Sequence, residues 1–393
     1  MELSESLDGN QKTVITGIGI ICPIGDSIEK VYENIEAKRN IIGSKVAVIE
    51  NFNPKDYLKK DAKLVRFMSK ETQFATIAAS KAIEDTKTFP YSEYEIAIYA
   101  GTGTTGIEFT DIEKMLNTSV DENGLFDIKK FGSEALYALN PLISFQILPN
   151  MPVCVASIYS KIKGNNQVFN PWEGNAAHAL LEAYYDLQME KEKCVIVGGS
   201  DYKTNSGAFI TLSQYGLMNN QENDLIGKPF NPDSKGFIPG EGSAYLVLEN
   251  LSKENKDHAY AQIIAIETVS DRESSLNYSM NSDLLADLIL KTLEVSELTI
   301  KDIELIFSSA DGNYMSDKIE EEALKKVFCE NLPLVLTPKE FTGNIFSASP
   351  YINIALGAYM LKNNLKNITN ILITGFGIGS EKFCSIIGKI ENE

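Results

Sequence analysis

Positive charge is scarce in this sequence. Its 393 residues include 36 lysines and arginines against 54 aspartates and glutamates, so the formal net charge is −18. Arginine occurs only at Arg39, Arg66 and Arg272, which leaves few groups that could clamp a phosphate with two hydrogen bonds. These shortages argue against binding to nucleic acid and against binding to an anionic membrane surface.

Long apolar runs and paired cysteines are also missing. No run approaches the roughly 18 apolar residues of a membrane-spanning helix. The N-terminal stretch MELSESLDGNQKT lacks the apolar region of a signal peptide. The cysteines stand singly, without a CxxC or Cys/His spacing, at Cys22, Cys154, Cys194, Cys329 and Cys384. We therefore expect a cytoplasmic protein with reduced cysteines, no metal site and no cofactor.

The chain does contain a regular alternation of apolar strands and amphipathic helices. Strands are predicted over residues 14–21, 94–100, 168–169, 194–197, 244–248, 260–267, 303–308 and 371–373, and helices over residues 27–37, 70–87, 107–117, 176–189, 282–293, 317–327 and 351–362. This order predicts an α/β protein whose sheets are covered by helices. The polar stretch at residues 250–256 marks the predicted boundary between two halves, 1–250 and 251–393.

Glycine-rich segments divide this pattern at several points. The strand segments TGIGI and TGFGIG, near the two ends of the chain, suggest an internal duplication. The GTGTTG stretch at residues 101–106 lacks the lysine of a phosphate-binding loop, so we interpret it as a strand-to-helix turn. Residues 121–162 have no clear periodicity and are predicted to form an interface or a lid.

One sharp turn carries an acidic residue at its tip. In KGNNQVFNPWEGNAAHAL, residues 163–180, a short apolar strand breaks abruptly into an alanine-rich helix. This is the geometry of a nucleophile elbow, in which the turn residue lies over the helix N-terminus. Glu173 stands where an enzyme would place Ser or Cys. The alternative is that Glu173 is an ordinary acidic residue stabilised by the helix dipole.

Taken in order, the motifs resemble those of the β-ketoacyl-acyl-carrier-protein synthases. The matching segments are VITGIGIICPIG at 14–25, RFM at 66–68, VGGSD at 197–201, KPFNPDSKGFIPGEGSAYLVLE at 228–249 and TGFGIGS at 374–380. The resemblance covers nearly the whole chain. It implies the thiolase fold, with two similar βαβ-type halves in a five-layered α-β-α-β-α arrangement and a two-fold dimer.

The sequence departs from that family at its catalytic positions. The resemblance places the nucleophilic cysteine on Glu173 and the two histidines on Ser309 and Asn344, while the family's lysine is retained as Lys339. A small shift of register would move the first histidine position into residues 310–312. Condensation needs a thiolate that accepts the acyl chain and imidazole groups that stabilise an enolate. We therefore expect no catalytic residue in this chain.

A family member without these groups resembles a chain length factor, the non-condensing subunit that pairs with an active ketosynthase in type II polyketide synthesis. Chain length factors usually carry Gln at the elbow, and Glu173 is nearly isosteric with it. The resemblance implies a heterodimer that meets an acyl carrier protein mainly through the partner, because this chain offers little positive charge. It also implies a tunnel or interface lined by Phe109, Ile112, Leu116, Gly207 and Ala208, and a gating loop at Gly375, Phe376 and Gly377.

Other interpretations stay open at this point. The apolar stripe of Phe109, Ile112 and Leu116 is equally typical of ordinary core packing. The chain could instead be a malonyl-carrier-protein decarboxylase that primes synthesis, although related decarboxylating domains keep their histidines. A third hypothesis is a homodimeric scaffold protein of the same fold.

Overall fold

A computed structural model describes residues 11–59, 63–87, 89–103, 108–218, 225–234, 236–271 and 280–390. The strands are β1 (Thr13–Ile21), β2 (Ile96–Thr102), β3 (Asn166–Phe169), β4 (Cys194–Tyr202), β5 (Glu241–Asn250), β6 (Ala261–Ser270), β7 (Leu305–Phe307), β8 (Leu334–Leu336), β9 (Asn370–Gly375) and β10 (Glu381–Gly388). They lie side by side in the order β3-β2-β4-β5-β1-β6-β10-β9-β7-β8. Among the described residues, the first five strands pair with the second five only through a short antiparallel contact of Val14 and Ile15 in β1 with β6.

The two sets of five strands have the same topology. In the first, β1 pairs antiparallel with β5, β5 antiparallel with β4, and β4, β2 and β3 follow in parallel. In the second, β6, β10, β9, β7 and β8 repeat this order and these directions. The duplication is therefore present, but the sequence clue for it was wrong. TGIGI lies in β1, whose counterpart is β6, whereas TGFGIG begins in the last two residues of β9, the counterpart of β4.

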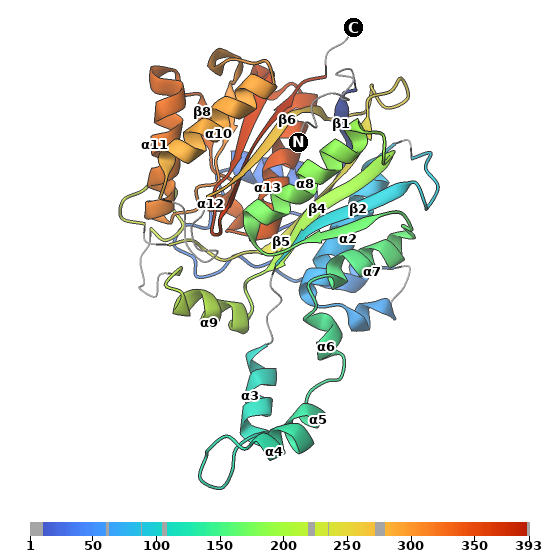
Figure 1. The fold of residues 1–393 in the computed structure, drawn as a ribbon, viewed down its shortest axis with the longest axis vertical. Coiled ribbons are helices and arrows are strands. Elements are labelled where there is room, and N and C mark those ends of the chain that lie inside the picture. Colours follow the sequence, from blue (N-terminus) through green and yellow to red (C-terminus); the bar gives the residue numbers. More distant parts are fainter. Residues whose placement is uncertain are drawn as a thin grey trace, which may run out of the picture.

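Helices form three layers around these strands (Figure 1). Helices α2 (Lys70–Asp85) and α7 (Met151–Ser160) pack on the outer face of the first set. Helices α10 (Ser282–Val295) and α11 (Tyr314–Phe328) cover the outer face of the second. Helices α8 (Trp172–Gln188) and α13 (Ser349–Lys362) lie between the two sets. The predicted five-layered thiolase fold is confirmed.

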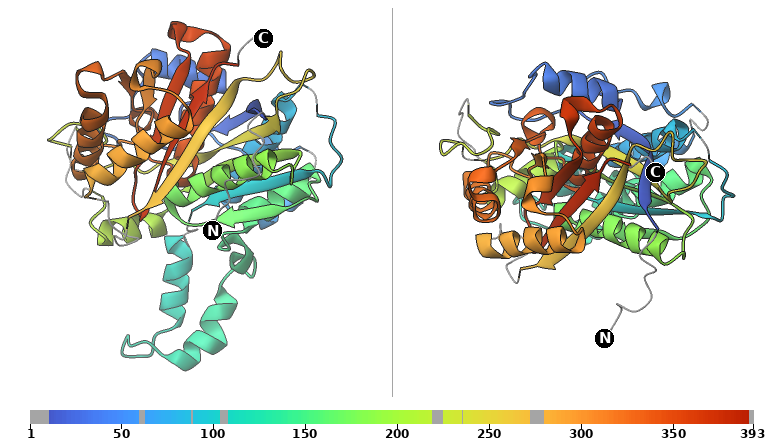
Figure 2. Two further views of the ribbon diagram at one scale, coloured as in Figure 1. Left: turned by 45° about the horizontal axis from the view of Figure 1, so that its top comes forward. Right: turned by 90° about the horizontal axis from the view of Figure 1, so that it is seen from above.

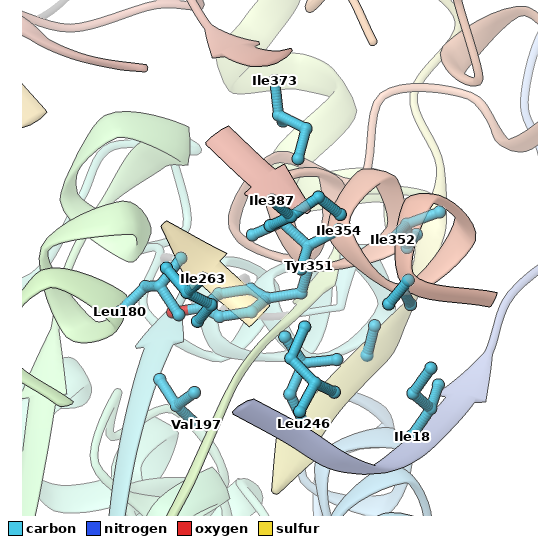
Figure 3. Packing of buried hydrophobic residues seen from close by; sticks show 14 of the residues in the cluster. Ile18, Leu180, Val197, Leu246, Ile263, Tyr351, Ile352, Ile354, Ile373 and Ile387 are labelled. Atoms are coloured by element: carbon cyan, nitrogen blue, oxygen red, sulfur yellow. The ribbon is translucent and has the colours of Figure 1, made fainter. Parts of the chain in front are cut away.

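The central layer explains why α13 has almost no polar face. Figure 3 shows Tyr351 of α13 reaching toward Leu180 of α8, while Ile354 of α13 lies beside Ile387 of β10. Val197 of β4 adds a side chain from the first set. A helix covered on all sides by protein is apolar all round, unlike a helix at a surface. Tyr351 still has a polar end, and its hydroxyl donates to the Ala176 carbonyl at 2.7 Å.

The helix predicted over residues 107–117 and part of the predicted insertion, residues 121–162, together form an arm that protrudes from the layered body (Figures 1 and 2). It contains α3 (Phe109–Thr118), α4 (Ile128–Lys130), α5 (Leu136–Ala138) and α6 (Ile143–Gln146). Large apolar side chains are exposed along it, at Phe109, Leu116, Leu125, Phe126, Ile128, Leu136, Tyr137, Phe145 and Leu148. The arm therefore offers an apolar surface that this chain alone does not cover.

The other helices are α1 (Ile28–Glu36), α9 (Ser206–Gln214) and α12 (Lys339–Thr342). Sequence reasoning missed α7, α9 and β10. Strand β10 is buried on both faces, so its side chains show no alternation of apolar and polar residues. The division into 1–250 and 251–393 stays a prediction; β5 ends at Asn250 and β6 begins at Ala261. Within the described residues, no helix is both long and apolar enough to cross a membrane.

Candidate functional site

The turn between β3 and α8 presents Glu173 at the start of the helix. Trp172 has a φ of +75°, a left-handed conformation that is strained for a bulky residue. Its indole packs against Phe346, with ring centroids 5.4 Å apart. The side chain of Glu173 is only 1% exposed. The predicted strand, sharp turn and helix are all present.

Lys339, the first residue of α12, binds the Glu173 carboxyl group. Its Nζ atom lies 2.6 Å from Oε2 of Glu173 and donates a second hydrogen bond, of 2.7 Å, to the Ser309 carbonyl oxygen. Burial raises the pKa of Glu173 from 4.5 to about 7, against the opposing effect of Lys339. Burial alone would lower the pKa of Lys339, but the carboxyl groups of Glu173 and Asp311 outweigh it and raise that pKa.

Ser309 has its hydrogen-bonding groups occupied by protein. Its backbone N–H donates to Oε1 of Glu320 at 3.1 Å, and its hydroxyl donates to Oε2 of the same residue at 3.4 Å. The hydroxyl oxygen also accepts the backbone N–H of Phe376 at 2.8 Å. Ser309 therefore joins the turn after β7 to helix α11 and to the loop after β9.

Asn344 is similarly engaged. Its amide nitrogen donates to Oδ2 of Asp311 at 2.7 Å, and its amide oxygen accepts the N–H of Phe346 at 2.8 Å. Asp317 in turn accepts backbone N–H groups from Asp311 and Gly312. Burial raises the pKa of Asp311, of Asp317 and of Glu320.

The structure thus brings Glu173, Ser309, Lys339 and Asn344 into one buried polar network. The side-chain donors of Ser309, Lys339 and Asn344 are bonded to the carboxyl groups of Glu320, Glu173 and Asp311 respectively. Oε1 of Glu173 is buried and has no hydrogen-bond partner among the residues that the structure describes. Among the described residues, no group of three or more His, Cys, Asp or Glu side chains could hold a metal ion.

Three acidic members of this network were missed by sequence reasoning, namely Asp311, Asp317 and Glu320. The sequence does contain a pattern that indicates two of them, Asp317 and Glu320. Asp317 and Glu320 are three residues apart in the predicted helix and lie on its buried face with Leu324. Acidic residues on an apolar helical face indicate buried partners, because an unpaired buried charge is costly.

The predicted tunnel residues lie elsewhere. Phe109 and Leu116 are 48% and 50% exposed on the arm, whereas Gly207 and Ala208 lie in the first turn of α9. The two groups are neighbours, because the Phe109 N–H donates to Oγ of Ser206 at 3.0 Å. Whether they line a tunnel stays a prediction.

The described part of the chain has cavities outside the buried network. One of about 390 Å³ lies between α1, α13 and the segment from β8 to α12. Another of about 330 Å³ lies between α2 and α6 at the base of the arm. None of the predicted tunnel residues lines either cavity.

Known proteins resemble this chain in sequence over both halves. Residues 43–254 match the family described as Beta-ketoacyl synthase, N-terminal domain, and residues 260–369 match its C-terminal domain. The chain belongs to the β-ketoacyl synthase family. The predicted family resemblance is therefore confirmed.

Curated relatives of this β-ketoacyl synthase family member are distant. A putative mitochondrial 3-oxoacyl-[acyl-carrier-protein] synthase of Schizosaccharomyces pombe is 26% identical over 344 residues, which cover 81% of this chain and 78% of that protein. The 3-oxoacyl-[acyl-carrier-protein] synthase 2 of Staphylococcus aureus is 23% identical, over 90% of this chain and 86% of its own length.

Solved structures share the fold. The ishigamide ketosynthase/chain length factor superposes with a TM-score of 0.80 and 17% identity, over 97% of this chain and 100% of that one. A β-ketoacyl synthase from Burkholderia phymatum gives the same TM-score at 18% identity, with the same coverage of both chains. At such low sequence identities the structural similarity establishes the fold alone. The activity has to be inferred from the residues of the site.

Proposed function

We propose that this chain is the non-condensing subunit of a ketosynthase heterodimer, equivalent to a chain length factor of type II polyketide synthesis. The observation that carries the proposal is the bond between Glu173 and Lys339 at the elbow. A condensing subunit needs a thiolate at that position to accept an acyl group. A buried carboxyl group held by an ammonium is a poor acyl acceptor, since the resulting anhydride would hydrolyse.

The other replaced positions favour the same function over a decarboxylase. Loss of carbon dioxide from a malonyl thioester needs donors that stabilise the enolate oxygen. Asn344 already donates to Asp311, and Ser309 already donates to Glu320. Neither can supply or take up a proton near pH 7 as an imidazole does.

The arm supports assembly with another ketosynthase chain. Its exposed apolar side chains, including Phe109 and Leu116, form a surface of the kind that marks protein interfaces. We propose that Phe109, Ile112, Leu116, Gly207 and Ala208 meet the partner there and border the channel that receives the growing chain. With a net charge of −18, this subunit would leave recruitment of an acidic carrier protein to its partner.

Native mass spectrometry tests this assignment. The chain would be expressed alone and together with a ketosynthase that retains Cys and both histidines, and each sample would receive malonyl-loaded carrier protein. We expect a 1:1 heterodimer with acyl mass only on the partner's cysteine.

Two results would replace the proposal. Release of carbon dioxide by the isolated chain would establish the decarboxylase. A stable homodimer that does not bind the ketosynthase and leaves malonyl-carrier protein intact would establish a scaffold protein.

A further inference from the structure

The loop that joins β9 to β10, residues 375–379, covers Glu173. A Cβ atom built on Gly377 would lie 3.0 Å from Oε2 of Glu173, so the loop backbone lies directly against the carboxyl group. Together with the packing of Trp172, this contact leaves Glu173 almost without solvent exposure. A group that approaches the elbow from the side of the loop must first displace it.

Buried side chains from outside the loop hold its backbone. The Phe376 N–H donates to Oγ of Ser309 at 2.8 Å, and the Phe376 carbonyl accepts the hydroxyl of Ser316 at 3.3 Å. Lys382 is fully buried on β10, and its Nζ donates to the carbonyls of Gly377, at 3.1 Å, and of Gly379. The backbone of the loop is thereby bonded at Phe376 to the turn after β7 and to α11, and at Gly377 and Gly379 to Lys382 of β10.

The loop's own side chains are anchored in two separate cores. Phe376 packs with residues of α10 and α11, and the Lys382 ammonium lies 5.3 Å from the centroid of its ring. Ile378 packs in the cluster that contains Trp172, the residue before Glu173. Opening the loop would therefore expose apolar surface as well as break hydrogen bonds, and both changes are unfavourable.

We propose that Ser309 and Lys382 are positioning residues that latch the 375–379 loop closed over Glu173, so that the thioester arm of a carrier protein cannot enter this subunit. This proposal rests on the proposed function and extends it. It gives the residue at the first histidine position a role, because the Ser309 hydroxyl bonds the loop instead of a substrate. A carrier-bound chain would then react only at the partner subunit.

A thiol placed under the loop measures whether the latch exists. Glu173→Cys would be introduced into the full chain, and the rate of alkylation at position 173 by iodoacetamide would be followed by peptide mass spectrometry. The exposed Cys329 provides an internal reference for reagent access. We expect slow labelling at position 173. Adding Ser309→Ala or Lys382→Met should increase that rate roughly tenfold, because each removes loop hydrogen bonds worth about 1 kcal/mol or more.

A matched control separates the latch from general loosening. Ser385 is also buried on β10, but its hydroxyl donates to the Ala265 carbonyl, away from the loop. Ser385→Ala should leave the labelling rate at position 173 unchanged. If that site is labelled as fast as Cys329 before any latch residue is changed, or if both latch variants label at the original rate, the proposal is wrong.

Hydrogen exchange gives a second measurement that needs no substitution. The Phe376 amide should be strongly protected in the unmodified chain, and exchange at the rate of an exposed loop would overturn the latch. Both measurements use the isolated chain, whereas the proposed function is tested by assembly with a ketosynthase. A heterodimer with an open loop would refute only the latch, and a homodimer with a closed loop would refute only the assigned function.

Discussion

Replacing Glu173 by glutamine should stabilise the protein at pH 8 while changing its stability little near pH 4.5. The pair formed by Glu173 and Lys339 looks like a stabilising salt bridge, with 2.6 Å between its atoms. Both side chains are buried, however. The free energy needed to remove a carboxylate from water exceeds the favourable electrostatic energy of its interaction with one ammonium group. Glutamine has almost the same shape and keeps an oxygen that can accept the Lys339 hydrogen bond.

The size of the effect follows from proton linkage. The pKa of Glu173 is about 7 in the folded chain against an ordinary value of 4.5. Between these values the folded state binds the proton and the unfolded state does not, so the free energy of unfolding falls as pH rises. This stabilising contribution is complete below pH 4.5 and lost once pH passes 7. The loss amounts to roughly 3 kcal/mol. The Glu173→Gln variant avoids this loss because a glutamine side chain does not ionise.

Urea denaturation of both proteins between pH 4.5 and 8 provides the assay. Asp311, Asp317 and Glu320 also have raised pKa values, but they are common to both proteins and largely cancel in the difference. We expect Glu173→Gln to gain about 3 kcal/mol relative to the parent across this range. Parallel stability curves, or a variant much less stable than the parent at pH 8, would show that Glu173 is ionised with an ordinary pKa.

Three other substitutions test the network, the core and the arm. Lys339→Met should lower the free energy of unfolding at pH 8 by about 3 to 5 kcal/mol, because the positive charge of Lys339 faces several buried acidic side chains. Urea denaturation measures this change, and a loss below about 1 kcal/mol would contradict the prediction. Tyr351→Phe should cost about 1 kcal/mol in the same assay, since the Ala176 carbonyl loses its 2.7 Å hydrogen bond. Leu116→Lys should lower the affinity of the heterodimer at least tenfold in a pull-down titration. Leu290→Lys on α10, at a site of the same 50% exposure, should leave the affinity unchanged. Equal effects of the two substitutions would show that the arm is not part of the interface.

Local sequence pattern was sufficient for the α/β class and for the elbow, whereas the five-layered arrangement was predicted from the family resemblance. The apolar run of β5 is short and bounded by turn residues, which is typical of a buried strand, whereas the apolar stripe of α2 has the period of a helix. The break at Pro171 between an apolar pair and an alanine-rich run located the turn that carries Glu173. The ordered motifs then identified the family, because they cover both halves of the chain.

Tertiary structure decided what surrounds these elements. Glu173 and Lys339 are 166 residues apart in the chain, and only the packing of α12 against the start of α8 brings them together. Ser309 meets Phe376 for the same reason, through a hydrogen bond between residues 67 positions apart. The stripe on α3 has the period of a buried helix, yet Phe109 and Leu116 are half exposed. Periodicity fixes which side chains share a face, but burial depends on which distant segment covers that face, and no local pattern contains that information.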